Sequence, residues 1–381
     1  MDKIFIKNKY ILRFTEWYDS IGGVQLSTKE HNKRLLKKGF SIFQVYLSDN
    51  KKTKINYSHG KTFIEVSIYR YCEISNFDKI LKEITKQNNI SLALLNGLCF
   101  PYSLHICKIL KSKEEPVPII YHHHQSNSVL SDTTIKLSNE NDLKQKIITI
   151  FDAMSHLVFL SEKELPLYIL KKYRSKIKII PDDIDLDYFK PVSSMNSKEN
   201  IILFPARITP NKGHEDLLYI CNYLRQKGMT FKILCIGPTN DVDFKKSVKT
   251  LVKDQFLENN ILFVGSKSLD ELKQLYNKGK VVISLSRTEG MGKVLQEAAA
   301  MKVPVVSYGT GGVSDVIKNG VNGYIIPPLN KKYFARSLYS ILINEERRQR
   351  MAKNARKFIS KYNSKIIFPE IIELYQNLMV N

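Results

Sequence analysis

The sequence predicts an α/β protein with two doubly wound, Rossmann-like domains that face each other across a cleft. Short apolar runs alternate with helical patterns along most of the chain, which is typical of parallel strands joined by helices. This alternation lapses once, at residues 183–199, and restarts at residue 200. A chain of 381 residues is also long enough for two domains of ordinary size.

The first half contains seven apolar runs that predict strands, with helical patterns between most of them. The polar residues that alternate in the run at 62–69 place that strand near a sheet edge. Two polar stretches, at about 50–62 and at 125–142, are expected to be loops. The expected strands are residues 9–16, 40–47, 62–69, 91–96, 117–122, 156–160 and 177–181.

The second half repeats the pattern and ends in a charged helical stretch at about 330–378. Its expected strands are residues 200–206, 231–237, 260–265, 281–286, 303–308 and 323–328. We therefore predict four segments along the chain. They are a first domain (1–182), a linker (183–199), a second domain (200–360) and a C-terminal helix (361–381).

The composition indicates a cytoplasmic globular protein. Hydrophobic residues make up 43% and charged residues 25% of the chain, and no apolar run approaches the ~20 residues of a membrane span. The lysines near the N-terminus leave no signal-peptide core. The five cysteines are odd in number and form no C-x-x-C pair, so we expect reduced thiols rather than disulfides or a zinc site.

The formal net charge of +22 permits three interpretations: a nucleic-acid surface, an anionic membrane surface, or lysines spread over solvated faces. Lysines occur in both halves and the aromatic residues form no stacking pattern, so nucleic acid is not an expected partner. Lysines spread over solvated faces explain the charge equally well; if the basic clusters at 33–39 and 171–178 do more than keep the protein soluble, the expected partner is the anionic inner face of a membrane, in peripheral contact.

The stretch SLSRTEGMGKVLQEAAAMKVP at 284–304 is the most informative part of the chain. Glu289 falls in the loop after an apolar strand, and Glu297 lies about one turn into the next helix. Open α/β sheets bind ligands beyond the carboxyl ends of their strands, and helix N-termini attract anions. These residue types suit a nucleotide-sugar, although an ordinary strand–turn–helix with two solvated glutamates would show the same spacing.

Several segments, taken in order, resemble the retaining glycosyltransferases of family 4, which have the GT-B fold. They are GGV (22–24), HLVFLSEKE (156–164), IKIIPDDIDLDYFKP (177–191), FPARITPNKG (204–213), LCIGP (234–238), residues 289–317 and NGVNGYIIPP (319–328). The resemblance implies transfer of a hexose-type sugar, with retention, from a donor such as a UDP- or GDP-sugar. It also implies that the domain at 1–182 binds the acceptor, that the domain at 200–360 binds the nucleotide-sugar, and that the helix at 361–381 packs back on the first domain. The expected acceptor is a saccharide or lipid-linked hydroxyl in cell-envelope polysaccharide or glycolipid synthesis, and no metal or other cofactor is expected.

The resemblance assigns roles to four charged residues of the second half. Glu289 would hold hydroxyls of the donor sugar, and Glu297 would bind the ribose diol of the nucleotide. Arg207 and Lys212 would hold the diphosphate, whose negative charge grows as the glycosidic bond breaks. Fixed cations of this kind can replace a divalent metal.

The resemblance also assigns backbone and first-half residues. The backbone at Gly290, Met291, Gly292, Lys293 and Val294 would contact the sugar and the phosphates. Gly22 and Gly23 would approach the same phosphates. His124 would lie beside the reacting sugar as a catalytic residue, although His122 and His123 are adjacent and the alignment leaves the choice among the three open.

The sequence departs from the family pattern at three places. The usual Pro-Asn-Gly turn reads Pro181-Asp182-Asp183, and Asp315 replaces a glutamate. Lys293 replaces an apolar residue, so its amine either reaches the phosphates or lies in solvent over a packed stem. Two D-x-D triplets at 183–187 match the metal signature of the other large glycosyltransferase fold, but a solvated turn at the domain junction is the favoured interpretation.

Two other function classes remain open from the sequence. The same fold could carry out epimerisation or phosphorolysis of a sugar, although no lysine is singled out for the Schiff base that a pyridoxal-dependent phosphorylase needs. A non-catalytic protein that binds polyanions or membranes would also explain the charge of +22.

Overall fold

The computed structural model describes residues 9–16, 23–50, 52–58, 62–69, 71–99, 101–123, 140–165, 167–192, 199–239 and 241–380. The chain divides into two compact units. The N-terminal unit comprises Met1–Ile180 and Glu370–Asn381, and the C-terminal unit comprises Pro181–Pro369. The chain therefore passes from one unit to the other twice.

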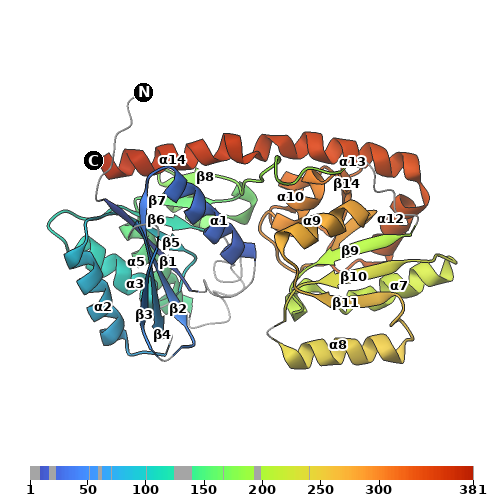
Figure 1. The fold of residues 1–381 in the computed structure, drawn as a ribbon, viewed down its shortest axis with the longest axis horizontal. Helices are drawn as coiled ribbons and strands as arrows, with labels where there is room; N and C mark the ends of the chain where they lie inside the picture. Colours follow the sequence, from blue (N-terminus) through green and yellow to red (C-terminus); the bar gives the residue numbers. More distant parts are fainter. Residues whose placement is uncertain are drawn as a thin grey trace. The chain divides into compact units, whose positions relative to one another are not determined.

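The N-terminal unit is built on an eight-stranded sheet, counted over the described residues, in the order β3-β4-β2-β1-β5-β6-β7-β8 (Figure 1). Every pair is parallel except β3 with β4. Its strands are β1 Tyr10–Thr15, β2 Ser41–Ser48, β3 Lys54–Ser58, β4 Phe63–Tyr69, β5 Ile90–Asn96, β6 Ile119–His122, β7 His156–Phe159 and β8 Ile177–Ile179. Its helices are α1 Gly23–Lys37, α2 Ile74–Gln87, α3 Tyr102–Lys111, α5 Glu140–Ala153 and α6 Leu167–Tyr173, with a 3₁₀ turn η2 at Glu162–Glu164.

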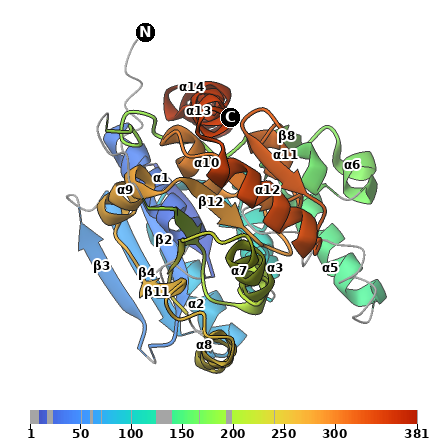
Figure 2. The same cartoon turned by 90° about the vertical axis from the view of Figure 1, so that its right-hand side faces the viewer.

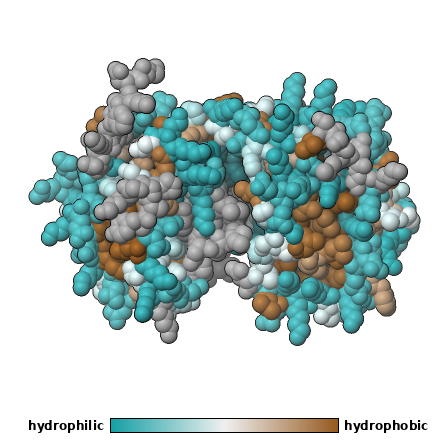
Figure 3. Space-filling view, viewed as in Figure 1, coloured by the Kyte–Doolittle hydropathy of each residue, from teal (hydrophilic) through white to brown (hydrophobic). Residues whose placement is uncertain are grey.

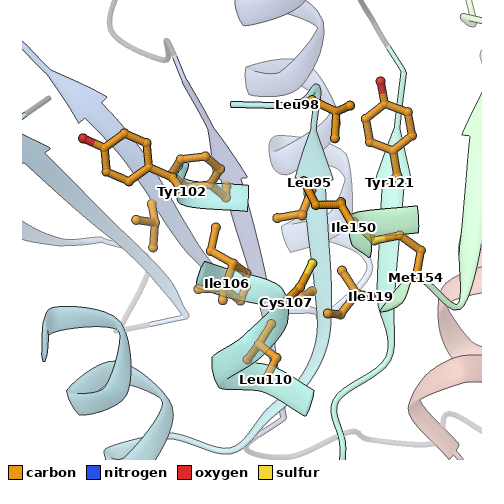
Figure 4. Packing of buried hydrophobic residues seen from close by; sticks show 14 of the residues in the cluster. Leu95, Leu98, Tyr102, Ile106, Cys107, Leu110, Ile119, Tyr121, Ile150 and Met154 are labelled. Carbon is orange, nitrogen blue, oxygen red and sulfur yellow. The ribbon is translucent and has the colours of Figure 1, made fainter. Parts of the chain in front are cut away.

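Burial on both faces explains why the central strands are almost wholly apolar. Strand β5, with the sequence ISLALLN, pairs with β1 on one side and β6 on the other, and residues 92–95 are fully buried. Leu95 and Ile119 of the sheet pack against Ile106 and Cys107 of α3 and Ile150 of α5 (Figure 4). This cluster forms the main core of the unit.

Strand β3 corrects the sequence-based expectation at the sheet edge. Residues 50–62 were expected to form a loop, but Lys54–Ser58 pair antiparallel with β4 (Figure 2). The strand at 63–69 is therefore second from the edge. An edge strand buries little surface, and here even Ile55 is 51% exposed. With a lysine and an asparagine beside it, this strand lacks the apolar pattern from which a strand is predicted.

The C-terminal unit has a six-stranded, all-parallel sheet within the described residues, in the order β11-β10-β9-β12-β13-β14. Numbered within the unit, this is the 3-2-1-4-5-6 order of the Rossmann fold. Its strands are β9 Ile201–Pro205, β10 Lys232–Ile236, β11 Ile261–Gly265, β12 Val281–Ser284, β13 Val305–Tyr308 and β14 Gly323–Ile326. Its helices are α7 Asp216–Gln226, α8 Val242–Asp254, α9 Leu269–Lys278, α10 Lys293–Ala300, α11 Val313–Val316, α12 Lys331–Ile343 and α13 Glu345–Ile359, with 3₁₀ turns η3 Pro210–Lys212 and η4 Ser360–Tyr362.

The described part of the expected linker, residues 183–192, belongs to the C-terminal unit. Ile184 and Phe189 are buried, and Ile184 bridges to Asn363. Arg356 of α13 donates hydrogen bonds to the carbonyls of Leu186 (2.9 Å) and Phe189 (2.6 Å). The apolar residues of this segment therefore anchor it in the C-terminal unit, although the sequence indicated a linker between two domains. Residues 193–198 of the expected linker lie outside the described residues.

Helix α14, Ser364–Val380, contains Pro369 and carries the chain from the C-terminal unit into the N-terminal unit. Tyr375 and Met379 of this helix are buried. The Tyr375 hydroxyl lies 2.9 Å from Nε2 of His122 in β6, and Lys9 donates to the carbonyl of Met379 at 2.8 Å. The last turns of the chain are thus part of the N-terminal unit's core.

The molecular surface is largely hydrophilic on the face shown in Figure 3. Among the described helices, none combines the length and the apolar character that crossing a bilayer requires. The structure therefore offers no membrane-spanning helix within the described residues.

Candidate functional site

The candidate site lies at the topological switch point of the C-terminal sheet. Strands β9 and β12 are neighbours there, although β10 and β11 separate them in sequence. The crossovers that leave β9 and β12 run to opposite sides, so their following loops diverge and leave room for a ligand at the carboxyl ends of the strands. Arg207 and Lys212 follow β9, and Glu289 follows β12.

The loop after β9 carries the two predicted cations. The side chain of Arg207 is exposed and makes no hydrogen bond with the described residues. Lys212 ends the 3₁₀ turn η3, which Gly213 closes in the left-handed conformation (φ 70°). A Cβ at Gly213 would lie 2.4 Å from the carbonyl oxygen of Leu285, so only glycine permits this approach of the β9 loop to the end of β12.

Lys212 and Glu289 form the central contact of the site. The Nζ of Lys212 lies 2.7 Å from Oε2 of Glu289, and the two side chains are only 17% and 18% exposed. Beside this pair, the N–H of Arg287 donates to the carbonyl of Asn211 at 2.8 Å, and the hydroxyl of Thr288 donates to Oδ1 of Asn211 at 3.1 Å. Three contacts thus join the β9 loop to the β12 loop.

The loop after β13 supports Glu289 from its backbone side. The N–H of Gly312 donates to the carbonyl of Gly290 at 3.0 Å. A Cβ at Gly311, where φ is +54°, would lie 1.7 Å from the carbonyl oxygen of Glu289. This glycine therefore lets a third loop, from a neighbouring strand, close against the residue that carries the site carboxylate.

Helix α10 begins at Lys293, directly after Gly292, which adopts the left-handed conformation (φ 77°), and no side chain caps this end. Met291 is buried and Val294 half-buried. The amine of Lys293 donates to the carbonyl of Asp183, and Nε2 of Gln296 donates to the carbonyl of Asp182 at 2.7 Å. The Lys293 amine therefore binds the segment where the chain enters this unit. This contact differs from both positions considered from the sequence, which were the phosphates and the solvent.

Glu297 is the most deeply placed carboxylate of the predicted site. It is 6% exposed, and its Oε2 accepts a hydrogen bond of 2.8 Å from the hydroxyl of Tyr276 in α9. Burial raises the pKa of Glu297 to about 7, against the opposing effects of the Tyr276 hydrogen bond and the charge of Lys293. The group therefore changes charge close to neutral pH.

A second buried carboxylate, Asp216 at the start of α7, holds the β12 loop through Arg287. Asp216 Oδ2 lies 2.5 Å from the guanidinium of Arg287 and 2.9 Å from the hydroxyl of Tyr308, and its Oδ1 lies 2.9 Å from Nζ of Lys331. Burial alone would raise the pKa of Asp216, but the hydrogen bonds from Arg287, Lys331 and Tyr308 lower it below its usual value.

His214 lies between Lys212 and Asp216 in sequence and is fully buried against the ring of Phe204, at 4.6 Å between ring centroids. Burial, with a smaller contribution from the charge of Lys212, lowers the pKa of His214 to about 4. The residue is therefore neutral at physiological pH and adds no charge to the site.

The predicted residues of the N-terminal unit are only partly described. Gly22 and His124 lie outside the described residues, and Gly23 is the first residue of α1. His122 and His123 are both buried. Nδ1 of His123 lies 2.7 Å from the hydroxyl of Tyr121.

The aspartates of the D-x-D run have local contacts. Oδ1 of Asp185 accepts hydrogen bonds from the N–H groups of Asp187 and Tyr188, each at 2.9 Å, and Asp187 lies 2.7 Å from Nζ of Lys365. Among the described residues, no group of three or more His, Cys, Asp or Glu side chains is placed to hold a metal ion. The Asp185 contacts are those of a capped turn.

Sequence reasoning did not find Tyr276, Asp216 or Arg287. The available signal for Tyr276 was its place in the amphipathic helix of residues 269–278. A tyrosine that is buried there requires a hydrogen-bond partner for its hydroxyl. No comparable signal exists for the Asp216–Arg287 pair, whose members are 71 positions apart.

Two Rossmann-like units in one chain define the class of fold, and solved structures agree with the GT-B architecture. Anabaena HepE in complex with UDP-glucose superposes with a TM-score of 0.79 at 16% sequence identity, covering 97% of this chain and 99% of that chain. The fold expectation from the sequence is confirmed.

Comparisons of the sequence with known proteins indicate the class of enzyme as well as the fold. The family model for glycosyl transferases group 1 matches residues 187–358. An uncharacterized glycosyltransferase of Methanocaldococcus jannaschii, MJ1178, is 24% identical over 366 residues, which cover 95% of this chain and 96% of that protein. The capsular polysaccharide biosynthesis glycosyltransferase CapM of Staphylococcus aureus is 27% identical over 242 residues, which cover 61% of this chain and 62% of CapM. These matches support a glycosyltransferase with the GT-B fold.

Proposed function

We propose that this protein is a retaining glycosyltransferase that moves a hexose-type sugar from a UDP- or GDP-sugar to a hydroxyl acceptor, without a metal ion. The observation that carries the proposal is the Lys212–Glu289 pair, at 2.7 Å, at the switch point of the C-terminal sheet. A cation for the diphosphate and a carboxylate for sugar hydroxyls are thereby held together, with the buried Glu297 in the following helix for the ribose diol. The complex of HepE with UDP-glucose supports this class of donor.

The chemistry that we propose uses fixed charges. The bond between the anomeric carbon and the diphosphate oxygen breaks, and the acceptor oxygen bonds to the same face of that carbon. The acceptor proton passes to the departing phosphate oxygen, so no enzymic nucleophile is needed. Arg207 and Lys212 would stabilise the charge that develops on the diphosphate, and the uncapped N-terminus of α10 would add to this effect. Gly22, Gly23 and His124 are proposed to complete the site.

The acceptor that we propose is a saccharide or lipid-linked hydroxyl of a cell-envelope polysaccharide. The relationship to CapM supports this class. The exposed lysines at 171, 172 and 178 suit peripheral contact with an anionic membrane. Flotation with vesicles that contain phosphatidylglycerol, at physiological salt, tests the membrane part; recovery of the protein only in the soluble fraction would contradict it.

Donor binding can be tested by thermal shift with UDP, GDP and ADP in the presence of EDTA. A glycosyltransferase of this kind is stabilised by one of the nucleoside diphosphates, and the apparent midpoint rises with nucleotide concentration. A protein that only binds polyanions would respond to heparin and show no preference among nucleotides. The same screen with intact nucleotide-sugars and product analysis separates sugar transfer from epimerisation and phosphorolysis.

Variants test the assigned residues. We expect Glu297→Ala to weaken nucleotide binding, and Arg207→Ala and Lys212→Ala to reduce turnover more than acceptor affinity. Lys246→Ala, which removes an exposed cation of α8, is the matched control and should behave like the unmodified protein. Normal donor turnover in the Arg207/Lys212 double variant would refute the assignment of these cations to the diphosphate.

A further inference from the structure

We propose that Tyr276 is a positioning residue that orients the carboxylate of Glu297 and keeps it ionised for the ribose diol of the donor. This inference rests on the proposed function, because it assigns Tyr276 to the nucleotide part of that site. Tyr276 contacts Glu297 and not the ligand, so its role would be exerted through the glutamate. Neither the motif pattern nor the loop glycines point to this residue.

The geometry gives the carboxylate one fixed oxygen. Tyr276 is 1% exposed, and its hydroxyl lies 2.8 Å from Oε2 of Glu297 and 3.4 Å from the carbonyl of Val294. The shorter contact shows that the phenolic O–H donates its hydrogen bond to the carboxylate. The hydroxyl belongs to α9, whereas Val294 and Glu297 belong to α10, so one side chain fixes the glutamate from a neighbouring helix.

The other oxygen of Glu297, Oε1, accepts no hydrogen bond from any described residue. A ribose diol carries two hydroxyl donors, and a carboxylate accepts a pair of donors well only when its plane is correctly oriented. With Oε2 held by Tyr276, the rotation about the terminal bond of Glu297 is restricted. The free acceptor positions are thereby presented in one orientation before the nucleotide arrives.

The charge state of Glu297 gives the inference a measurable signature. Burial raises the pKa of Glu297 to about 7, and the hydrogen bond from Tyr276 counteracts that rise. The titratable groups that act on this carboxylate are Tyr276 of α9, Lys293 of α10 and Tyr188 of the segment before β9. Only Tyr276 donates a hydrogen bond to it among the described residues, so loss of that hydroxyl should favour the protonated form.

The test is the affinity for UDP and GDP, measured by calorimetry from pH 6 to pH 9, for the unmodified protein, Tyr276→Phe and a matched control. Tyr223→Phe is the control, because Tyr223 is a half-buried tyrosine of the same unit whose hydroxyl makes no hydrogen bond with described residues. We expect Tyr276→Phe to move the midpoint of the pH profile upward by about one pH unit, which is the effect of losing one charge-assisted hydrogen bond. Affinity at pH 7 should fall roughly fivefold, and the loss should shrink towards pH 9.

The possible outcomes separate the two proposals. If the unmodified protein binds no nucleoside diphosphate, the proposed function and this inference both fail. If it binds and the midpoint of the pH profile does not move in Tyr276→Phe, whether the affinity is unchanged or falls equally at every pH, the proposed function stands and the role of Tyr276 in keeping Glu297 ionised is overturned. Ionisation of the diphosphate itself is common to all variants and cancels in the comparison.

A second variant keeps the inference falsifiable if Tyr276→Phe alters the fold. In a Glu297→Gln background there is no carboxylate to keep ionised, so adding Tyr276→Phe should leave the pH profile of nucleotide affinity unchanged. Circular dichroism and the thermal midpoint report the fold of each variant. A pH shift that persists in the Glu297→Gln background would show that Tyr276 acts through another group.

Discussion

The buried carboxylate of Asp216 offers the sharpest test of how the candidate site is held together. We predict that Asp216→Asn, which keeps the shape and removes the charge, destabilises the C-terminal unit and loosens the loop that carries Glu289. Asp216 is 1% exposed; its Oδ2 accepts hydrogen bonds from Arg287 at 2.5 Å and from Tyr308 at 2.9 Å, and its Oδ1 forms an ion pair with Lys331 at 2.9 Å. The substituted amide cannot satisfy both cations at once.

The magnitude follows from the burial of the partners. Breaking a fully buried ion pair costs about 3–5 kcal/mol. The side chains of Arg287 and Lys331 are 29% and 42% exposed, so water compensates part of the loss and the lower end, about 3 kcal/mol, is appropriate. For a unit of this size each kcal/mol shifts the thermal midpoint by about 2–4 °C, which gives a decrease of roughly 6–12 °C.

The assay is scanning calorimetry at pH 7, together with nucleotide affinity. Asp243→Asn is the matched control, because Asp243 is an exposed carboxylate in the first turn of α8, and its change should stay within about 0.5 kcal/mol. A decrease of less than about 2 °C for Asp216→Asn, relative to this control, would refute the view that the pair is structurally important. An unchanged nucleotide affinity would show that Arg287 does not hold the Glu289 loop.

Two further predictions concern pH and the loop glycines. The folded-state pKa of Glu297 is raised from 4.5 to about 7, so its contribution to stability is present below pH 4.5 and is lost as the pH rises through 7. The difference in the free energy of unfolding between the unmodified protein and Glu297→Gln should therefore fall by about 3 kcal/mol from pH 4.5 to pH 7, as measured by urea titration. Unfolding free energies that change in parallel with pH for the two proteins would contradict this prediction. A Cβ at Gly311 would lie 1.7 Å from the Glu289 carbonyl, so Gly311→Ala should weaken nucleotide binding at least about tenfold. The control is Gly320→Ala, where an added Cβ meets nothing within 4 Å and binding should be unchanged. Equal nucleotide affinities for the two variants would refute this prediction.

The parts of the fold that were predictable from the sequence are those governed by local patterns. The run at 281–285 is apolar because β12 is buried on both faces, and Gly213 and Gly311, in the loops beside it, are needed for the loop contacts. Strand β3 was missed because a short edge strand with an exposed isoleucine needs neither length nor apolar character. Residues 183–192 were predicted as part of a linker because they lack apolar periodicity, although three buried apolar residues, Ile184, Leu186 and Phe189, anchor the segment.

The site was predictable only where its residues lie in recognisable motifs. Lys212 and Glu289 were singled out from their loops, and the structure brings them within 2.7 Å. The Asp216–Arg287 contact joins elements far apart in the sequence, which no local pattern encodes, and the tyrosine in the helix at 269–278 did not reveal which carboxylate it binds. The amine of Lys293 was considered for phosphate or solvent, but its actual partner, the carbonyl of Asp183, is 110 residues away.

The return of the last residues to the N-terminal unit has a consequence for biosynthesis and for protein engineering. Residues 370–381 complete that unit, and Tyr375 and Met379 fill its interior. During translation, residues 1–180 cannot finish folding until the helix at 364–380 has left the ribosome. Expression of residues 1–180 alone would expose the side chains that Tyr375 and Met379 cover, whereas fusion of that helix to the fragment should restore a soluble species.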